Sequence, residues 1–133
     1  MPHTVLVVDD DPVMHPLMEH HLERAGYKMI SAKNGREAIE MARRELPELI
    51  IMDVLMPEMG GLITLRQLKE TEATNAIPVI IVTVHDDSTT QQECKLSGAA
   101  AFLIKPVSPT QLLAELRRLL PRSEADGEAG KTR

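Results

Sequence analysis

Acids, a hydroxyl and a lysine follow four apolar runs of the sequence, at places where they could share one reaction site. Asp9-Asp10-Asp11-Pro12 follows the first run, Asp53 ends another, and Thr83 and Lys105 end or follow two later ones. An acid at the end of a fully apolar strand is costly unless it is paired, solvated or bound to a metal. These residue types therefore indicate charge chemistry that involves cations.

The carboxylates predict a magnesium site. Carboxylates held together repel one another, which disfavours full ionisation unless a cation joins them. Mg²⁺ takes one or two carboxylates, waters and phosphate oxygens as ligands. A loop that cradles a phosphate directly would be rich in glycine or hydroxyl groups, whereas the loop at 9–11 is anionic. We therefore expect a phosphate to arrive with the metal, and Lys105 to supply a second positive charge.

Each of these residues also has an ordinary structural explanation. Asp11 before Pro12 predicts a helix N-cap with proline at the first helical position. Asp9 and Asp10 could form a solvated turn, and a strand threonine or a surface lysine needs no special role. The ordered combination, rather than any single residue, indicates a site.

Short β-branched runs alternate with helical patterns along the chain, which is typical of βα repetition around a parallel sheet. In such sheets ligands bind at the carboxyl ends of the strands, so the acids, the hydroxyl and the lysine would share one edge. Three runs are continuously apolar, as expected for central strands covered on both faces. The expected strands are Thr4–Val8, Lys28–Ala32, Leu49–Met52, Val79–Thr83 and Ala101–Ile104, of which the first, third and fourth are central.

Apolar residues at helical spacing predict a helix in four of the five segments that follow the strands. The fourth connection, residues 86–96, has almost no apolar face, so packing stabilises it little and it is a candidate mobile element. Pro16 falls about one turn into the first helix, so we expect a late or irregular start there. The predicted apolar stripes are Leu17, Leu22 and Ala25; Ala38, Ile39, Ala42 and Leu46; Leu62, Leu65 and Leu68; and Leu112, Leu113, Leu116, Leu119 and Leu120.

Composition limits the function further. The chain has 133 residues, a net charge of −5 and only two aromatic residues, Tyr27 and Phe102. It is long enough for one domain, expected at 1–120, with a polar tail or the start of a linker at 121–133. Binders of single-stranded nucleic acid stack bases on several aromatic rings beside basic grooves, so a direct nucleic-acid partner is not expected.

Targeting signals and metal-binding histidines are not evident in the sequence. The lone Cys94 cannot form an intramolecular disulfide, and no apolar stretch approaches the ~20 residues that cross a bilayer. We expect a cytoplasmic protein without membrane contact. None of the five histidines has the spacing of a metal site.

The ordered set of residues resembles the CheY-like receiver domains of bacterial two-component response regulators, over about residues 4–120. This resemblance implies a flavodoxin-like (βα)5 fold, a doubly wound parallel α/β sheet with strand order 2-1-3-4-5. It rests on the acidic pair Asp9 and Asp10, the run Asp53-x-x-x-Pro57-x-x-x-Gly61, Thr83, Phe102 and the pair Lys105-Pro106.

The resemblance also implies a reaction. Asp53 would accept a phosphoryl group from the phosphohistidine of a sensor histidine kinase or phosphotransfer protein. Asp10, Asp53 and the backbone carbonyl of Leu55 would coordinate Mg²⁺, and Asp9 would assist through water. The chain would be a signalling domain that catalyses its own phosphorylation and dephosphorylation, rather than a conventional enzyme.

Three further positions have roles implied by the resemblance. Lys105 would contact the phosphoryl oxygens, and the Lys105–Pro106 peptide bond would be cis, a form that costs little only before proline. After transfer, Thr83 would bond a phosphoryl oxygen and Phe102 would turn inward behind it. Phe102 is equally explained as a core residue, and it has no hydroxyl that needs a partner.

The expected output is a population shift on the face made by the fourth helix, the fifth strand and the fifth helix. A downstream protein or effector domain would bind there, and a homodimer could form on phosphorylation.

Two other functions stay open at this point. An aspartyl-nucleophile phosphohydrolase commonly has a second acid two residues after the nucleophile, where Leu55 stands. A receiver-like module could also bind a partner without phosphorylation.

Val84 is bulkier than the small residue that many receiver domains have after the threonine, so it would narrow access to the site. Leu55 and His85 would flank the path of attacking water. We hypothesise that Leu55 shields the acyl phosphate.

Overall fold

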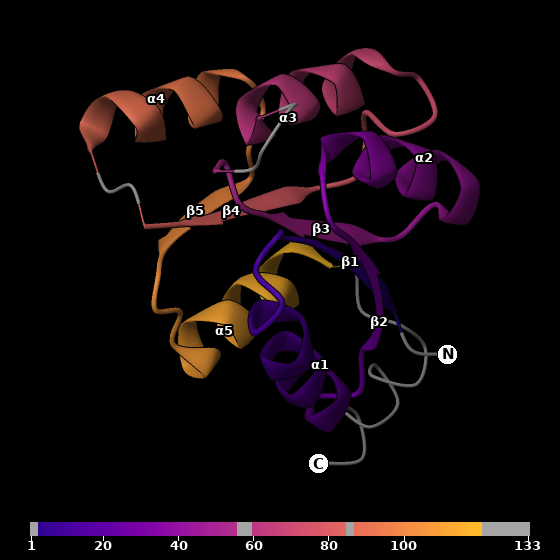
Figure 1. Cartoon of the computed structure of the whole chain (residues 1–133), viewed down its shortest axis with the longest axis vertical. Helices are drawn as coiled ribbons and strands as arrows, with labels where there is room; N and C mark the ends of the chain where they lie inside the picture. The colour runs from indigo at the N-terminus through magenta and orange to yellow at the C-terminus, as the bar shows by residue number, and fades with distance from the viewer. Residues whose placement is uncertain (1–2, 56–59, 85–86, 121–133) are drawn as a thin grey trace.

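Five parallel strands form one sheet in the order β2-β1-β3-β4-β5, as predicted (Figure 1). The computed structural model describes residues 3–55, 60–84 and 87–120. Pro57, His85 and the predicted tail at 121–133 lie outside the described residues. The strands have the predicted bounds: β1 (Thr4–Val8), β2 (Lys28–Ala32), β3 (Leu49–Met52), β4 (Val79–Thr83) and β5 (Ala101–Ile104).

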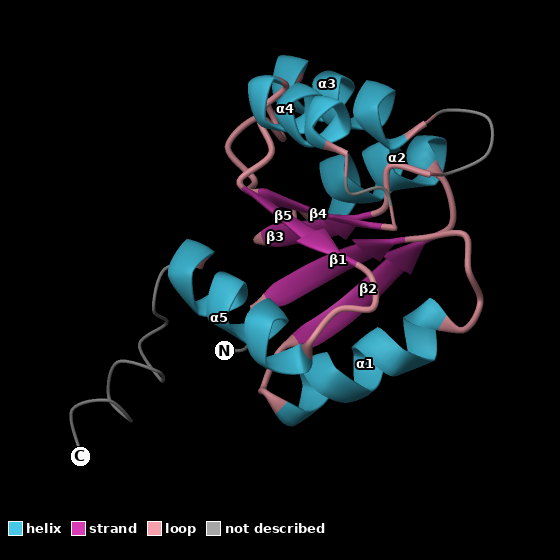
Figure 2. Cartoon of the chain, turned by 90° about the vertical axis from the view of Figure 1, so that its left-hand side faces the viewer, coloured by secondary structure: helices cyan, strands magenta, loops and turns pink. Residues whose placement is uncertain are grey.

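Helices cover both faces of the sheet (Figure 2). Helices α1 (Met14–Arg24) and α5 (Pro109–Leu119) lie on one face, and α2 (Gly35–Glu45), α3 (Gly61–Glu70) and α4 (Ser88–Leu96) lie on the other. None of the described helices has the length and apolarity to span a membrane.

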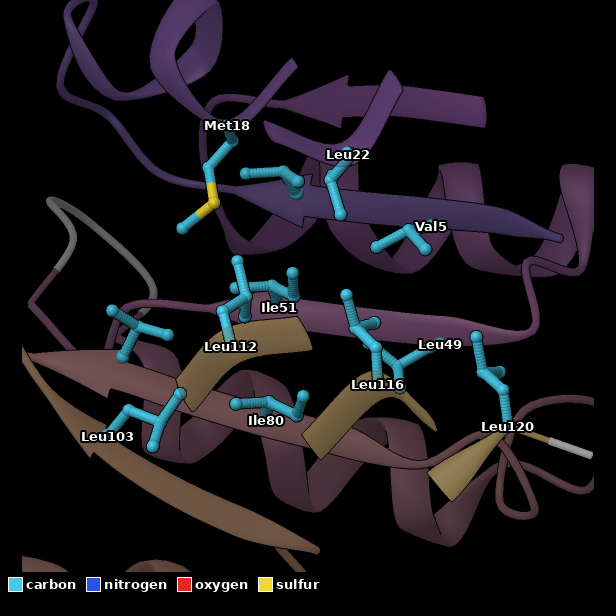
Figure 3. Close-up of a cluster of buried hydrophobic side chains, with 12 residues drawn as sticks. Val5, Met18, Leu22, Leu49, Ile51, Ile80, Leu103, Leu112, Leu116 and Leu120 are labelled. Atoms are coloured by element: carbon cyan, nitrogen blue, oxygen red, sulfur yellow. The ribbon is translucent and has the colours of Figure 1, made fainter. Parts of the chain in front are cut away.

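The core consists of two clusters, one on each face of the sheet. Val5 and Val7 of β1 pack on the side of α1 and α5, whereas Leu6 and Val8 pack on the side of α2, α3 and α4. Figure 3 shows the first cluster, in which Leu112 and Leu116 of α5 lie over the sheet. Because β3 and β4 are buried along their whole length and β1 is buried from Val5 to Val8, their carboxyl ends form a rigid edge.

Helix α1 begins later than the predicted N-cap requires. Asp11 does not cap it: the Asp11 carboxylate accepts a hydrogen bond from the Val13 amide at 2.9 Å, and the helix starts at Met14. The prediction of an N-cap at Asp11 with Pro12 in the helix is therefore wrong, because these residues form a separate turn. Pro16 falls within the first helical turn, where an N–H would have no intrahelical partner, and the predicted late start is confirmed.

Two predicted stripe residues are exposed. Leu17 is 49% exposed, and Met18 takes its place in the core beside Leu22. Leu46 is 55% exposed because it is the left-handed C-cap of α2, with φ of 47°.

Helix α4 is attached weakly, as predicted. Its one buried residue is Cys94, which packs against the sheet with the cluster on the side of α2 and α3. The remaining described positions of the helix offer the core little apolar surface, so tertiary packing contributes little to its stability.

Candidate functional site

The carboxyl ends of four neighbouring strands bring the predicted residues together. Asp9 follows β1 and Asp53 follows β3, and the adjacent pairing of Val8 with Met52 places the two acids side by side. Lys105 follows β5, and its amide donates to the Thr83 carbonyl at the end of β4 at 2.8 Å. The edge predicted from the sequence is therefore the edge on which these four residues lie.

The Lys105 ammonium joins the two buried acids. Its Nζ lies 2.9 Å from Asp9 Oδ2 and 2.7 Å from Asp53 Oδ2. Asp9 is 3% exposed and Asp53 6%, so both carboxylates are shielded from bulk water and interact strongly with the cation. The Lys105–Pro106 peptide bond is cis, as the resemblance implies.

Burial lowers the pKa of Lys105, but the hydrogen bonds and negative charges of Asp53 and Asp9 outweigh it, so the pKa lies above the ordinary value of 10.5. The lysine is consequently charged at neutral pH. A fixed positive charge beside Asp53 is suited to hold an incoming anion.

Backbone amides fix the remaining carboxylate oxygens. Asp53 Oδ1 accepts from the Leu55 amide at 2.9 Å, and Asp9 Oδ1 accepts from the Asp11 amide at 2.9 Å. Each buried acid is thus held by one amide and by Lys105. The Asp10 side chain is exposed and forms no hydrogen bond or ion pair with Asp9, Asp53 or Lys105.

Gly61 lets α3 approach the backbone beside Asp53. A Cβ at Gly61 would lie 2.4 Å from the Asp53 carbonyl oxygen and 2.4 Å from Val54 Cα, both closer than atoms can pack. The Gly61 amide donates to the Val54 carbonyl at 3.0 Å. The glycine therefore sets the position of the segment that carries Asp53.

Gly61→Ala is expected to lower the free energy of unfolding by an amount near the upper end of about 1–3 kcal/mol, because backbone atoms cannot move aside as a flexible side chain can. Gly60→Ala is the matched control, since the nearest atom to its Cβ would be the Val54 carbonyl oxygen at 3.9 Å. That control should cost less than about 1 kcal/mol. Urea denaturation followed by circular dichroism measures both, and equal losses would contradict the role given to Gly61.

The other predicted positions surround this group. Thr83 is fully buried at the end of β4, and Phe102 is partly buried against the cluster on the side of α2, α3 and α4. Leu55 is 47% exposed and Val84 60%, so two apolar side chains lie in solvent after β3 and β4.

The sequence profile of the response regulator receiver domain family matches residues 5–117. The chain belongs to this family. Protein PilH of Pseudomonas aeruginosa is 38% identical to this receiver domain over 116 residues, which are 87% of the chain and 96% of PilH. The family and fold predicted from the sequence are thereby confirmed, and the chain is a receiver domain of the kind found in two-component signal transduction.

Solved structures agree with this assignment. The chemotaxis protein CheY4 of Vibrio cholerae matches with a TM-score of 0.85 and 33% identity, over 90% of this receiver domain and 100% of CheY4. The receiver domain of the sensor histidine kinase PA1611 of Pseudomonas aeruginosa matches with a TM-score of 0.83 and 26% identity. The match covers 90% of this receiver domain and 98% of the PA1611 chain. The PA1611 structure has a magnesium ion coordinated in its active-site cleft.

The acidic edge of this receiver domain fits Mg²⁺ by its donor chemistry. Asp9, Asp10 and Asp53 bring three negative charges against the single positive charge of Lys105, and all their donors are oxygens, which Mg²⁺ prefers. Among the described residues, however, no three His, Cys, Asp or Glu side chains are already gathered as a metal site. Asp9 and Asp53 are brought together, whereas Asp10 lies on the solvent side.

One residue of the receiver site was missed by sequence reasoning. His15 Nε2 lies 2.6 Å from the carbonyl oxygen of Asp9. The spacing of the histidines along the sequence tests only for a metal site. The available signal was the position of His15 in the helix that follows the acidic loop, within reach of that loop.

Proposed function

We propose that this receiver domain accepts a phosphoryl group on Asp53 from the phosphohistidine of a sensor histidine kinase or phosphotransfer protein. Receiver domains of the family interact with histidine kinases and downstream effectors. The observation that carries the proposal is the Lys105 ammonium held between two buried carboxylates, 2.7 Å from Asp53 and 2.9 Å from Asp9. This arrangement supports the proposal because the carboxylate that would act as the nucleophile lies beside a cation at one sheet edge. Transfer from a kinase further implies a cytoplasmic location.

The transfer moves one group between two atoms. A carboxylate oxygen of Asp53 attacks phosphorus, and a P–O bond forms while the P–N bond of the phosphohistidine breaks. The bonding electron pair stays on the imidazole nitrogen. Phosphoryl transfer needs mainly positioning and neutralisation of charge, and the buried Lys105 ammonium supplies both to the phosphoryl oxygens. The Thr83 hydroxyl would bond one of these oxygens after transfer.

Asp10, Asp53 and the backbone carbonyl of Leu55 would hold Mg²⁺, and Asp9 would contribute through water. The bound ion would neutralise charge on the phosphoryl oxygens. The excess of two negative charges at the edge supports this part of the proposal. The protein's own contribution is to keep Asp53 fixed through the Leu55 amide and Lys105.

The experiment that tests the proposal is incubation of the chain with Mg²⁺ and either a phosphorylated histidine phosphotransfer protein or phosphoramidate, which has a P–N bond. Intact-mass spectrometry should show one added phosphoryl group per chain. No addition with Mg²⁺ present would overturn the proposal.

Leu55→Asn is expected to hasten loss of the phosphoryl group. The half-exposed Leu55 side chain would exclude water from the acyl phosphate, whereas an amide can hydrogen-bond an attacking water. One such bond of about 1 kcal/mol corresponds to roughly fivefold in rate. Phosphate release after removal of the donor measures the effect. An unchanged rate would refute the shielding by Leu55, and Ile63→Asn, an equally exposed apolar residue on α3, is the control.

The output would be carried by α4, β5 and α5, through a downstream protein, an effector domain or a second copy of the chain. Weak attachment of α4 through Cys94 supports a face whose population can shift on modification. Sedimentation of the chain with and without beryllofluoride distinguishes a homodimer from an unchanged monomer.

Phe102 is expected to change its side-chain rotamer when a phosphoryl mimic binds. It is partly buried against the cluster that holds Cys94, and it carries no hydroxyl to fix either orientation. Crystal structures or side-chain NMR with and without beryllofluoride and Mg²⁺ measure the change. The same rotamer in both states would show that Phe102 does not take part in the switch.

A further inference from the structure

His15 contacts the acidic loop from the first turn of α1. Its ring is partly buried, and Nε2 lies 2.6 Å from the Asp9 carbonyl oxygen. Because a carbonyl oxygen can only accept, Nε2 must carry the proton and donate. This hydrogen bond joins the helix to the end of β1, and its 2.6 Å length is slightly shorter than the usual N–H···O range.

This bond fixes a peptide group next to Asp10. The Asp9 carbonyl belongs to the peptide group that precedes Asp10, and His15 holds it. The Asp11 amide belongs to the peptide group that follows Asp10, and Asp9 Oδ1 holds it at 2.9 Å. Both peptide groups that flank Asp10 are therefore anchored, although the Asp10 side chain itself lies in solvent.

The other ring nitrogen of His15 indicates that this side chain does more than fill space. His15 Nδ1 is buried and has no hydrogen-bond partner among the described residues. A buried polar atom without a partner is unfavourable, so an apolar side chain would fill the same space at lower cost. The favourable polar contact of His15 in the described part of the chain is the bond to Asp9.

We propose that His15 is a positioning residue for Mg²⁺ binding: it holds the peptide group before Asp10, so that the backbone that carries this exposed carboxylate is already fixed when the ion arrives. The inference rests on the proposed function, in which Asp10 holds the ion. A preorganised ligand loses less freedom on binding, so loss of the His15 bond weakens affinity for the ion rather than removing a ligand.

The test is a titration of the full chain with MgCl₂ alone, followed by the amide NMR signals of residues 9–11 and 53. His15→Phe keeps the ring and removes the donor, and His15→Gln keeps an amide donor at similar reach. His20→Phe places the same substitution at an exposed position of α1. Urea denaturation of each variant without Mg²⁺ measures the separate effect on stability. If His15→Phe does not fold, His15→Met takes its place.

We expect about fivefold weaker Mg²⁺ binding for His15→Phe, as for one lost hydrogen bond. His15→Gln should bind within about twofold of the wild type, and His20→Phe should bind like the wild type. Unchanged affinity in His15→Phe, with or without a loss of stability, would overturn the inference and leave the proposed function intact. Equal weakening by Phe and Gln would also overturn it. If the wild type itself binds no Mg²⁺, the metal site of the proposed function fails together with this inference.

Discussion

Asp53→Asn is expected to abolish phosphorylation of the chain. An amide oxygen is a far weaker nucleophile than a carboxylate, and Asp53 is the buried acid that Lys105 contacts at 2.7 Å. Asparagine has nearly the same shape, and its carbonyl oxygen can still accept from the Leu55 amide, so the fold should persist. Beryllofluoride with Mg²⁺ should shift the amide NMR signals of the wild type and leave those of the variant unchanged.

The matched control is Asp11→Asn. Asp11 belongs to the same acidic loop but is exposed, and its carboxylate accepts only the Val13 amide among the described hydrogen bonds. An asparagine oxygen can accept that bond as well. The control should respond to beryllofluoride like the wild type, and a response retained by Asp53→Asn would place the acceptor elsewhere.

Lys105→Met is expected both to prevent stable phosphorylation and to destabilise the fold. It leaves the carboxylates of Asp9 and Asp53 buried and facing each other without the cation between them. Removal of one partner from a buried ion pair typically costs about 3–5 kcal/mol, and the slight exposure of Lys105 places this variant near the lower value. Added MgCl₂ should restore part of the lost stability, because a divalent cation can compensate the charge of the same carboxylates.

Urea denaturation in EDTA and in MgCl₂ measures the loss of stability and its partial recovery, and intact-mass spectrometry after incubation with phosphoramidate and Mg²⁺ measures phosphorylation. Lys95→Met, an exposed lysine on α4, is the control and should change stability by less than about 0.5 kcal/mol. Equal stability of Lys105→Met and Lys95→Met in EDTA would contradict the account of the buried pair.

The pH dependence of the Lys105 effect has a definite sign. The folded-state pKa of Lys105 is raised above 10.5, through Asp53 and Asp9 against the opposing effect of burial. Its stabilisation is therefore fully present below the ordinary lysine pKa and is lost as the pH rises through the raised value. The difference between the wild type and Lys105→Met should stay constant near neutral pH and shrink only under strongly alkaline conditions.

The strands and the acidic edge could be predicted because their signals are local. Runs such as Leu49–Met52 and Val79–Val82 are continuously apolar and rich in β-branched residues, so their burial between two helical layers follows directly. Once the strands were known, the carboxyl-end rule placed Asp9, Asp53 and Lys105 on one edge, where the ammonium indeed bridges the two acids.

The parts that sequence reasoning missed depend on geometry between elements. Adjacent helix positions differ by about 100°, so choosing Met18 rather than Leu17 for the core requires the direction of α1. The Asp11 turn replaced an N-cap because Asp9 and Asp11 hold the backbone before the helix. The contact of His15 with Asp9 depends on how α1 is oriented against the acidic loop, and no local sequence pattern predicts this orientation.

The most direct measurement identifies the residue that carries the phosphoryl group. The chain is phosphorylated with phosphoramidate and Mg²⁺ and then reduced with borohydride, which converts an aspartyl phosphate to homoserine, and peptides are sequenced by mass spectrometry. We expect homoserine at position 53 and unmodified aspartate at positions 9, 10 and 11. Homoserine at another acid, or none in a phosphorylated chain, would contradict this expectation.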